Sequence, residues 1–571
     1  MVDYNWDSDT VDTVRKYAMQ NTVEYDGAGQ SGSVLGRLLG ERSDLRPRAK
    51  ELKSLVEKEV EAANKMAKEN GINAVRDSLA ATNPEALERQ KQQKRVGLKL
   101  LPNAIQGKVI LRFAPNPNGP LTIGHSRGVI INSEFAKMYS GKVVLRYDDT
   151  DTRVKPPLPE AYGWIEEEYE WLAGRPADIV IRASERMPIY LEYAKQMLES
   201  GFGYICQCTA LEFKTLRDNS QSCICRGKTV EDNLSDWLAM NDGSIEEGGA
   251  VVRVKTDLEL PNPALRDWPA LRIQHSPHPM VGDSYKVWPL LDFQSAIEDY
   301  LQGVTHIVRG KDLMDSTRKQ TLLYNHFGWD YPEPLYWGRV KVHEFGGFST
   351  SGMRADIADG KFEGWNDSRL PTISALKRRG FDPQAIRDFW LDLGLTQKDI
   401  SISMQTIESF NSSVIDAVCE RRSFVRNPRA LCFNMIGSEL PEKLQIARHP
   451  HDEIEGFREW KISDKFVIED TDYSEQLRLK DFADISINHN DALVDSLERS
   501  DKRPIVHWLP INQSRMARLT SPSGSGFRVE EGLIENFELV EGTVVQLERV
   551  GFARIEKIPE NGPVDLLYLH G

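Results

Sequence analysis

The segment between residues 108 and 151 constrains the fold more than any other part of the chain. Lys108–Phe113 is a β-rich run that ends in a turn of proline, asparagine and glycine residues, which break strands. A helical pattern follows over Ser126–Ser140, and a second β-rich run, Lys142–Tyr147, leads into an acidic turn. A strand, a helix and a strand in this order predict a βαβ unit, and therefore an α/β domain with a parallel sheet.

The rest of the chain must supply further domains, because 571 residues exceed what one hydrophobic core can organise. Glu51–Lys68 has apolar residues at helical spacing, and the Gly-rich stretch 27–32 before it is expected to be a loop. The polar run Glu88–Arg95 is expected to link this helical module to the βαβ unit.

Beyond Arg426 the pattern changes to short β-rich runs, such as Phe466–Ile468 and Val544–Leu547, separated by turn residues. This spacing is typical of β-barrels or β-sandwiches, whereas residues 376–425 look helical. Charge runs usually form solvated helix faces, but their position makes three basic clusters candidates for contact with RNA. They are Lys377–Arg379, Arg421–Arg422 and Arg426–Arg429.

Composition adds limits on location and partners. The net charge of −14 argues against a general nucleic-acid binder, since phosphate binding needs lysine and arginine, but a sum over the whole chain does not describe local patches. No run of 18 apolar residues occurs, and the first residues lack the basic and apolar regions of a secretory signal. A cytoplasmic protein is therefore expected.

Four of the six cysteines form two C-x-C pairs with fourteen residues between the pairs: Cys206, Cys208, Cys223 and Cys225. In a cytosolic chain such clustering favours a metal over disulfides. Four thiolates suit a tetrahedral Zn²⁺ ion with a closed, structural ligand shell. The alternative is four ordinary cysteines that oxidation could pair.

The turn at residues 117–127 is a candidate nucleotide site. In a doubly wound sheet, ligands bind beyond the carboxyl ends of the strands, and a helix that begins there offers free N–H groups to phosphate. His125 adds a donor for a charged transition state at the α-phosphate. The alternative is a Pro/Gly loop with an incidental histidine.

The run Arg112–His125 resembles the opening signature of the glutamyl- and glutaminyl-tRNA synthetases. Its last four residues stand where class I synthetases carry the tetrapeptide HIGH, with a threonine, which can still donate a hydrogen bond, in place of the first histidine. The resemblance assigns nucleotide binding to Pro117, Gly119, Gly124 and His125. It assigns catalytic roles to Thr122, Gly124 and His125, and substrate contacts to Arg112, Ala114 and Asn116.

Leu145–Asp151 resembles a second block of the same family, in which the first acidic residue contacts the α-amino group of the substrate. That residue is Asp148 here. An ammonium group that leaves water needs a nearby anion, so the assignment is physically reasonable. The alternative is an acidic loop tip or a cap of the next helix.

Pro289–Asp312 resembles the family segment that closes the amino-acid pocket, with Ser295 as a further substrate contact. Glutamyl enzymes carry an arginine at the position of Arg309, which reads the side-chain carboxylate of glutamate, and glutaminyl enzymes carry an uncharged residue there. A buried guanidinium prefers a carboxylate over an amide, because the amide cannot neutralise it. The alternative is a surface arginine after a strand. Leu291 departs from the family, which has an aromatic hydroxyl at that position.

Gly346–Arg354 lies where the class I KMSKS loop belongs, and the sequence of residues 363–372 is similar to that of the glutamyl and glutaminyl enzymes. The resemblance assigns catalytic roles to Ser349 and Ser351. The second lysine of the family motif aligns with Thr350, so another residue must donate positive charge to the triphosphate. The hypothesis is that Arg354, the nearest cation, does so.

Arg426–Ala430 and Gln546–Phe552 resemble the β-barrel anticodon-binding region of glutaminyl enzymes, and the N-terminal runs Arg15–Ala18 and Gly36–Gly40 complete a resemblance to glutamyl-tRNA synthetases of the archaeal type. The implied fold is multidomain α/β, with a Rossmann catalytic core. The implied domains are an N-terminal helical module (1–105), the first half of the core (106–205), an acceptor-binding insertion with the four cysteines (206–285), the second half of the core (286–345), the KMSKS-like loop with a helical stem-contact region (346–425) and the β-barrel region (426–571).

The resemblance implies ATP-dependent activation of L-glutamate to glutamyl-adenylate and its transfer to the 3′-terminal adenosine of tRNA-Glu. It implies ATP with Mg²⁺ as a substrate, a structural Zn²⁺, tRNA-Gln as a second substrate and a transient complex with a tRNA-dependent amidotransferase. Two alternatives stay open. The first is a glutaminyl-tRNA synthetase, and Arg309 argues against it. The second is a non-catalytic tRNA-binding homologue. Thr122 and Thr350, which depart from the family motifs, favour it, but such a protein would not need an amino-acid pocket.

Overall fold

The computed structural model describes residues 6–25, 27–42, 45, 48–83, 97–345, 348–434, 440–450, 456–524 and 526–571. The chain divides into two compact units, Met1–Val96 and Gly97–Gly571. The predicted linker Glu88–Arg95 and the glycines at the start of the KMSKS-like loop, Gly346 and Gly347, lie outside the described residues.

The first unit is helical, as predicted. Its helices are α1 (Ser8–Glu24), α2 (Ser31–Glu41), α3 (Ala49–Asn70) and α4 (Ile72–Thr82). Val14, Leu38 and Leu52 meet in its apolar core. The Gly-rich stretch was predicted to be a loop as far as residue 32, but α2 already begins at Ser31. Gly29 allows a close approach there, because a Cβ atom would lie 2.5 Å from Oγ1 of Thr22.

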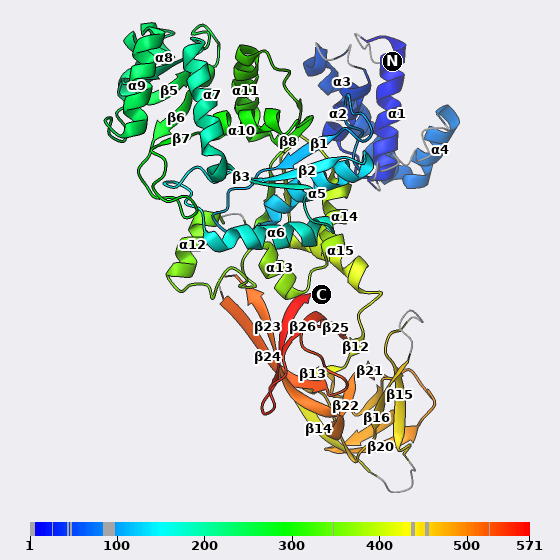
Figure 1. Cartoon of the computed structure of the whole chain (residues 1–571). Helices are drawn as coiled ribbons and strands as arrows, with labels where there is room; N and C mark the ends of the chain where they lie inside the picture. The colour runs from blue at the N-terminus through cyan, green and yellow to red at the C-terminus, as the bar shows by residue number, and fades with distance from the viewer. Residues whose placement is uncertain are drawn as a thin grey trace. The chain divides into compact units, whose positions relative to one another are not determined.

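The predicted βαβ unit is confirmed in the second unit. β1 (Ile110–Phe113), β2 (Lys142–Tyr147) and β3 (Ile179–Arg182) pair in parallel, as do β8 (His306–Gly310) and β9 (Glu333–Trp337). Thr305 N donates to Ile110 O at 2.9 Å, which ties β8 to β1. The spatial order is therefore β3-β2-β1-β8-β9, the order of a doubly wound sheet, and it reverses between β1 and β8. Figure 1 shows β1, β2, β3 and β8 of this sheet.

Helices cover this sheet, which explains why its strands are apolar on both faces. They are α5 (Ile123–Met138), α6 (Pro159–Ala173), α10 (Leu291–Leu301) and α11 (Met314–Phe327). The core between α5 and the strands includes Leu111, Val143 and Ile130. Gly128 lets α5 approach β1, since a Cβ atom there would lie 3.0 Å from the Phe113 ring.

Between β3 and β8 the chain forms a separate antiparallel sheet. Its strands are β4 (Gly203–Cys206), β5 (Val251–Val254), β6 (Pro269–Ile273) and β7 (Val287–Pro289), and its helices are α7 (Met187–Glu199), α8 (Ala210–Asp218) and α9 (Val230–Asp242). Trp268 and Trp288 are fully buried in its core.

After the sheet come α12 (Thr350–Ala358), α13 (Ile373–Arg379), α14 (Pro383–Leu393) and α15 (Met404–Ile415). The helical prediction for 376–425 is wrong at β11 (Ile400–Ile402), which pairs in parallel with β10 (Val340–Val342), and at its end, where β12 (Arg421–Arg422) and β13 (Phe424–Arg426) are strands. In each case partners distant in the chain supply the hydrogen bonds. In the part of the chain that the structure describes, no helix has both the length and the apolar character needed to cross a membrane.

The predicted β-rich end forms two seven-stranded sheets. The first has the order β12 (Arg421–Arg422), β25 (Val544–Leu547), β26 (Gly551–Lys557), β27 (Val564–His570), β23 (Ser514–Ser523), β24 (Gly526–Glu535) and β13 (Phe424–Arg426). The second has the order β21 (Ile505–Val506), β18 (Gln476–Leu479), β19 (Asp484–Asn488), β20 (Asp491–Ser496), β14 (Pro428–Phe433), β17 (Lys465–Glu469) and β22 (Trp508–Pro510).

Both sheets curl toward closure. β12 and β13 are separated in the chain only by Ser423, yet they are the two outer strands of the first sheet. β21 and β22 are likewise separated only by His507 and are the outer strands of the second. Outer strands that are consecutive in the chain can exist only if the sheet brings its edges together, so both sheets are nearly closed, barrel-like structures.

Candidate active site

A cavity of about 610 Å³ opens where the strand order reverses, beyond the carboxyl ends of β1 and β8. Arg112 and Phe113 from β1 and Arg309 and Gly310 from β8 line it. The N-terminal turns of α5 form another wall. This is the position at which doubly wound sheets bind their ligands.

The cavity is rich in positive charge. Six lining side chains are basic, Arg112, Arg146, Lys155, Arg272, Arg309 and Lys319, and three are acidic, Asp148, Asp151 and Asp292. Each acidic side chain is paired: Arg146 with Asp148 (3.0 Å), Arg272 with Asp151 (2.9 Å) and Lys319 with Asp292 (2.8 Å). Arg112 lies 3.4 Å from Asp299. Within the described ranges this leaves Arg309 and Lys155 without a carboxylate partner, so the cavity suits a ligand with at least two anionic groups.

A buried ion network forms one end of the cavity. Arg146 donates to Asp148 (Nε, 3.0 Å), to Asp299 (Nη1, 2.7 Å) and to Ser295 Oγ (Nη2, 2.9 Å). Burial by itself would lower the pKa of Arg146, but the two carboxylates raise it above its ordinary value, so the guanidinium stays charged. Asp148 Oδ1 also accepts from Gln294 at 3.1 Å. The network holds Asp148 and Arg112, an anion and a cation, at one end of the cavity.

Arg309 is only 5% exposed, and its hydrogen-bond partners among the described residues are all neutral. Its Nη2 donates to Thr317 Oγ1 (2.7 Å), Gln320 Oε1 (3.0 Å) and Tyr331 OH (2.5 Å). Its Nε is buried and has no hydrogen-bond partner in the described part of the chain. A buried, uncompensated guanidinium is costly, and an anionic ligand group would relieve that cost.

The α5 end of the cavity presents His125 in a defined tautomer. The backbone N–H of Thr122 donates to His125 Nδ1 at 3.2 Å, so the proton of the neutral ring lies on Nε2. Burial, aided by the nearby charge of Lys155, lowers the pKa of His125 to about 4. At neutral pH the ring is therefore a neutral donor beside Gly124, Gly128 and Asn132, which line the same wall.

The structure brings together many of the site residues predicted from the sequence. Eight of them line the cavity: Arg112, Ala114, Asn116, Gly124, His125, Asp148, Ser295 and Arg309. Thr122 precedes α5 and acts on the cavity through His125. Pro117 accepts a hydrogen bond from Leu158 N at 2.8 Å and does not line the cavity.

Gly119 joins the two signature blocks. A Cβ atom at Gly119 would lie 2.7 Å from Cγ2 of Thr350 and 3.0 Å from the Trp365 ring. Ile123 N donates to Pro371 O, and Ile373 N donates to Leu121 O, so the segment after the loop lies against the turn before α5. The KMSKS-like segment and the HIGH-like turn are therefore in direct contact.

Gly119→Ala is expected to slow adenylate formation about tenfold, because the added methyl group overlaps Thr350 and displaces α12. Thr350→Ser removes Cγ2, the nearest obstructing atom, and should restore part of the rate in the double variant. Pre-steady-state adenylation of both single variants and the double variant checks this. Additive losses in the double variant would show that the contact is not what matters.

The predicted loop residues lie near the cavity but do not line it. Ser349 precedes α12, and its Oγ accepts from Gly352 N at 3.1 Å and lies 3.5 Å from Ser351 Oγ. Arg354 Nη1 donates to Pro156 O at 3.3 Å. The residue before Pro156 is Lys155, which does line the cavity. Arg354 therefore anchors the segment that carries Lys155.

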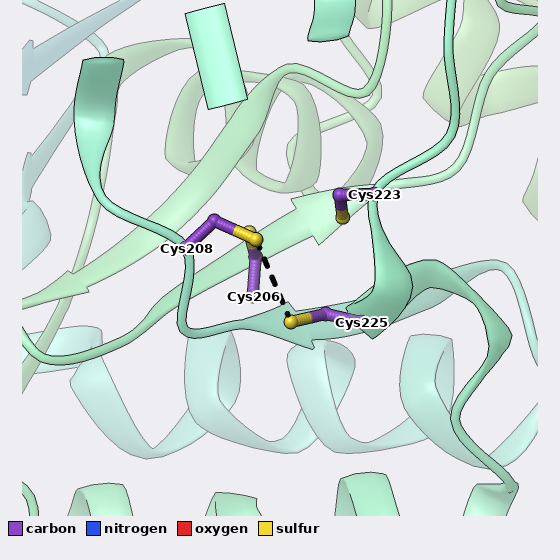
Figure 2. A group of neighbouring side chains, drawn as sticks. All are labelled: Cys206, Cys208, Cys223 and Cys225. Atoms are coloured by element: carbon purple, nitrogen blue, oxygen red, sulfur yellow. Dashed lines mark hydrogen bonds between the residues drawn. The ribbon is translucent and has the colours of Figure 1, made fainter. Parts of the chain in front are cut away.

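The four clustered cysteines converge from β4 and the turn after α8 (Figure 2). Their Sγ atoms all lie within 4.8 Å of one another, and those of Cys208 and Cys225 are 3.8 Å apart. A tetrahedral ion with Zn–S bonds of about 2.3 Å separates its sulfur ligands by about 3.8 Å. The donor set and spacing therefore fit a closed Zn²⁺ shell, and none of the four cysteines lines the cavity.

Most of the arginines in the predicted RNA-binding clusters are already paired inside the protein. Arg378 binds Glu556 (2.8 Å), Arg421 binds Asp416 (2.8 Å) and Arg426 binds Glu469 (2.8 Å). Arg379 and Arg422 are buried. These side chains form ion pairs within the barrel-like sheets and the helices before them, so their charges are largely neutralised inside the protein.

Several cavity residues escaped the sequence analysis. Arg146, Lys155, Gln294, Lys319 and Gln320 line the cavity. An arginine within the apolar β2 strand was a visible signal for Arg146, because a buried charge needs partners. The others lie on loops or helix faces where polar residues are ordinary, so the sequence carries no comparable signal.

Comparison with known proteins identifies this arrangement. Residues 108–417, more than half of the chain, match the family model described as tRNA synthetases class I (E and Q), catalytic domain. A glutamate–tRNA ligase from Methanothrix thermoacetophila is 42% identical over 561 residues, which covers 96% of this chain and 97% of the relative. Glutamate–tRNA ligases from Archaeoglobus fulgidus (41%) and Pyrococcus furiosus (39%) match over 96% and 97% of this chain and 98% of their own length.

A crystal structure of a glutamate tRNA ligase from Elizabethkingia meningosepticum, in complex with its amino acid, covers 54% of this chain and 70% of its own, at 21% identity and a TM-score of 0.39. Similarity this low adds nothing to the assignment. The sequence relatives and the family model are sufficient: the chain belongs to the glutamate–tRNA ligase family of class I tRNA synthetases.

Proposed function

We propose that the chain is a glutamate–tRNA ligase that activates L-glutamate with Mg-ATP in this cavity and transfers the glutamyl group to the 3′-terminal adenosine of tRNA-Glu. The observation that carries the proposal is Arg309, buried at the carboxyl end of β8 and held only by neutral groups. In a glutaminyl enzyme this buried charge would stay uncompensated, since the side-chain amide of glutamine cannot neutralise it.

Glutamate is assigned to the part of the cavity near Arg112, Asp148 and Arg309, and the ATP phosphates to the part at the start of α5. Arg112 would hold the α-carboxylate of glutamate, Asp148 its α-amino group and Arg309 its side chain. Gly124 and the Nε2–H of His125 would face the phosphates at the start of α5, where free N–H groups and the helix dipole favour anions. Ser295 orients Arg146, which in turn holds Asp148. The protein contributes position and charge and no covalent nucleophile.

Lys155→Met is expected to slow adenylate formation about 10- to 100-fold with little change in the KM for glutamate, because Lys155 has no carboxylate partner among the described residues and its charge acts on His125. Arg354→Met should slow the same step, since Arg354 anchors the Lys155 segment. Arg153→Met is the matched control, because Arg153 is exposed and paired with Glu247 (3.0 Å). Single-turnover adenylation measures all three, and an unaffected rate in Lys155→Met would remove that side chain from the reaction.

The remaining parts of the chain have proposed roles in binding tRNA. The insertion between β3 and β8 would receive the acceptor end, with a structural Zn²⁺ held by the four cysteines, and the barrel-like sheets would bind the anticodon. We also propose that tRNA-Gln is charged with glutamate and passed to an amidotransferase in the cytoplasm. These roles rest on the resemblance of the segments concerned.

Aminoacylation of purified tRNA-Glu with labelled glutamate or glutamine tests the function. Glutamyl-tRNA should accumulate and glutaminyl-tRNA should not. Charging with glutamine alone would identify the chain as a glutaminyl enzyme, and the absence of charging with either amino acid would favour a non-catalytic binder. Adding tRNA-Gln as a separate substrate tests the proposed wider tRNA specificity in the same assay.

A further inference from the structure

Arg309 is oriented by three neutral side chains that come from outside its own strand. Thr317 and Gln320 lie one turn apart on α11, and Tyr331 lies in the loop before β9. The oxygens of all three lie within hydrogen-bond distance of the same nitrogen, Nη2, and share its two N–H donors. The Nη2 end of the guanidinium is therefore held in place, while Nε has no partner among the described residues.

Gln320 is the centre of this arrangement, and its own orientation is determined. Its Oε1 accepts from Arg309 and, at 2.7 Å, from Tyr331 OH, and its Nε2 donates to Asp292 O at 3.3 Å. Burial is the main cause that raises the pKa of Tyr331 to about 12, so the phenol stays neutral and keeps its proton for Gln320. Tyr336 OH supports the third partner by donating to Thr317 Oγ1 at 2.7 Å.

The chemistry of these partners determines whether the positive charge of Arg309 is neutralised inside the protein. Most of the other basic side chains around the cavity are paired with carboxylates, as Arg146 is with Asp148 and Arg272 with Asp151. Gln320 is 1% exposed and lies where a carboxylate of nearly the same shape would fit. An amide at this point orients Arg309 through its dipole but does not neutralise it.

We infer that Gln320 is a positioning residue that sets amino-acid specificity: its neutral amide holds Arg309 in place and leaves the guanidinium charge for the side-chain carboxylate of the substrate. This inference rests on the proposed function, because it concerns the group that reads glutamate. It predicts that the charge at position 320, more than its shape or hydrogen bonds, controls the preference for the acid over the amide.

Gln320→Glu in the full-length chain tests this with little change in volume. The new carboxylate would pair with Arg309, so the KM for glutamate should rise about 10- to 100-fold, while kcat and the KM for ATP change little. The ratio of kcat/KM for glutamate over glutamine, measured by charging of tRNA-Glu, should fall by a similar factor. Gln320→Met, which is neutral but lacks all three of these hydrogen bonds, is the matched control: its KM for glutamate should rise, but the preference for the acid should persist.

A folded Gln320→Glu protein with an unchanged glutamate-to-glutamine ratio would overturn the inference, as would an equal loss of preference in Gln320→Met. A purely structural role would lower the melting temperature or kcat of both variants without separating their ratios. The unmodified chain in the same assay keeps this outcome distinct from a failure of the proposed function, because that failure would appear as the absence of glutamate charging before any substitution.

Discussion

Arg309→Met is expected to reduce kcat/KM for glutamate by a factor of about 10² to 10⁴. The guanidinium is buried, and removing one partner of a buried ion pair costs about 3–5 kcal/mol, which corresponds to that range of rates. The loss should appear mainly as a higher KM for glutamate, because the proposed role of Arg309 is to bind the substrate side chain and not the phosphates. Steady-state charging of tRNA-Glu at varied glutamate concentrations measures it.

Arg272→Met provides the control for this prediction. Arg272 lines the same cavity but is already paired with Asp151 at 2.9 Å. Its replacement should leave the ratio between glutamate and glutamine within a few-fold of the unmodified chain. If both variants lost the preference equally, the discrimination would belong to the overall charge of the cavity and not to Arg309.

The second large effect concerns the four cysteines. Among the described residues, the apolar cluster around them contains only two other buried side chains, Tyr204 and Phe213, and the ion pair of Arg226 with Asp267 (2.9 Å) adds a polar tie, so a metal would be a major part of what stabilises this turn. Structural Zn²⁺ contributes about 10–16 kcal/mol to the folding of small zinc modules. Cys208→Ser is therefore expected to abolish stoichiometric metal binding, unfold the segment around residues 206–227 and eliminate charging of tRNA.

Metal analysis by mass spectrometry, together with hydrogen exchange over the segment, measures both effects. Cys432→Ser is the matched control, because Cys432 is half-buried on β14 and lies outside the cluster. It should retain the metal and the charging activity. Purified, active protein without bound metal, and with four titratable thiols in the cluster, would refute the zinc site.

The core of the site could be predicted because its information is local. β2 begins and ends at the predicted residues. The turn before α5 is specified by consecutive residues, from Arg112 to His125. An apolar strand that ends in proline and glycine specifies both its own boundary and the helix start that follows. Family resemblance then attached roles to Asp148 and Arg309.

The groups that tune the site could not be predicted, because their contacts are not local. Gln320 and Tyr331 reach Arg309 from α11 and from a loop, and nothing in their sequence surroundings distinguishes them from ordinary polar residues. Lys155 lies in a loop, where a lysine is ordinary and gives no signal of a site. The same limitation applies to β11, whose strand conformation depends on β10, and to the curled sheets, whose closure depends on pairing between residues such as Arg421 and Gln546.

The most direct test of the whole account is the affinity of the unmodified chain and of Arg309→Met for two non-reactive adenylate analogues, glutamyl- and glutaminyl-sulfamoyl adenosine, measured by calorimetry. The unmodified chain should bind the acidic analogue at least about 100-fold more tightly than the amide, and Arg309→Met should bind the two with similar affinity. Equal binding by the unmodified chain, or a preference for the acid that survives in Arg309→Met, would contradict the account.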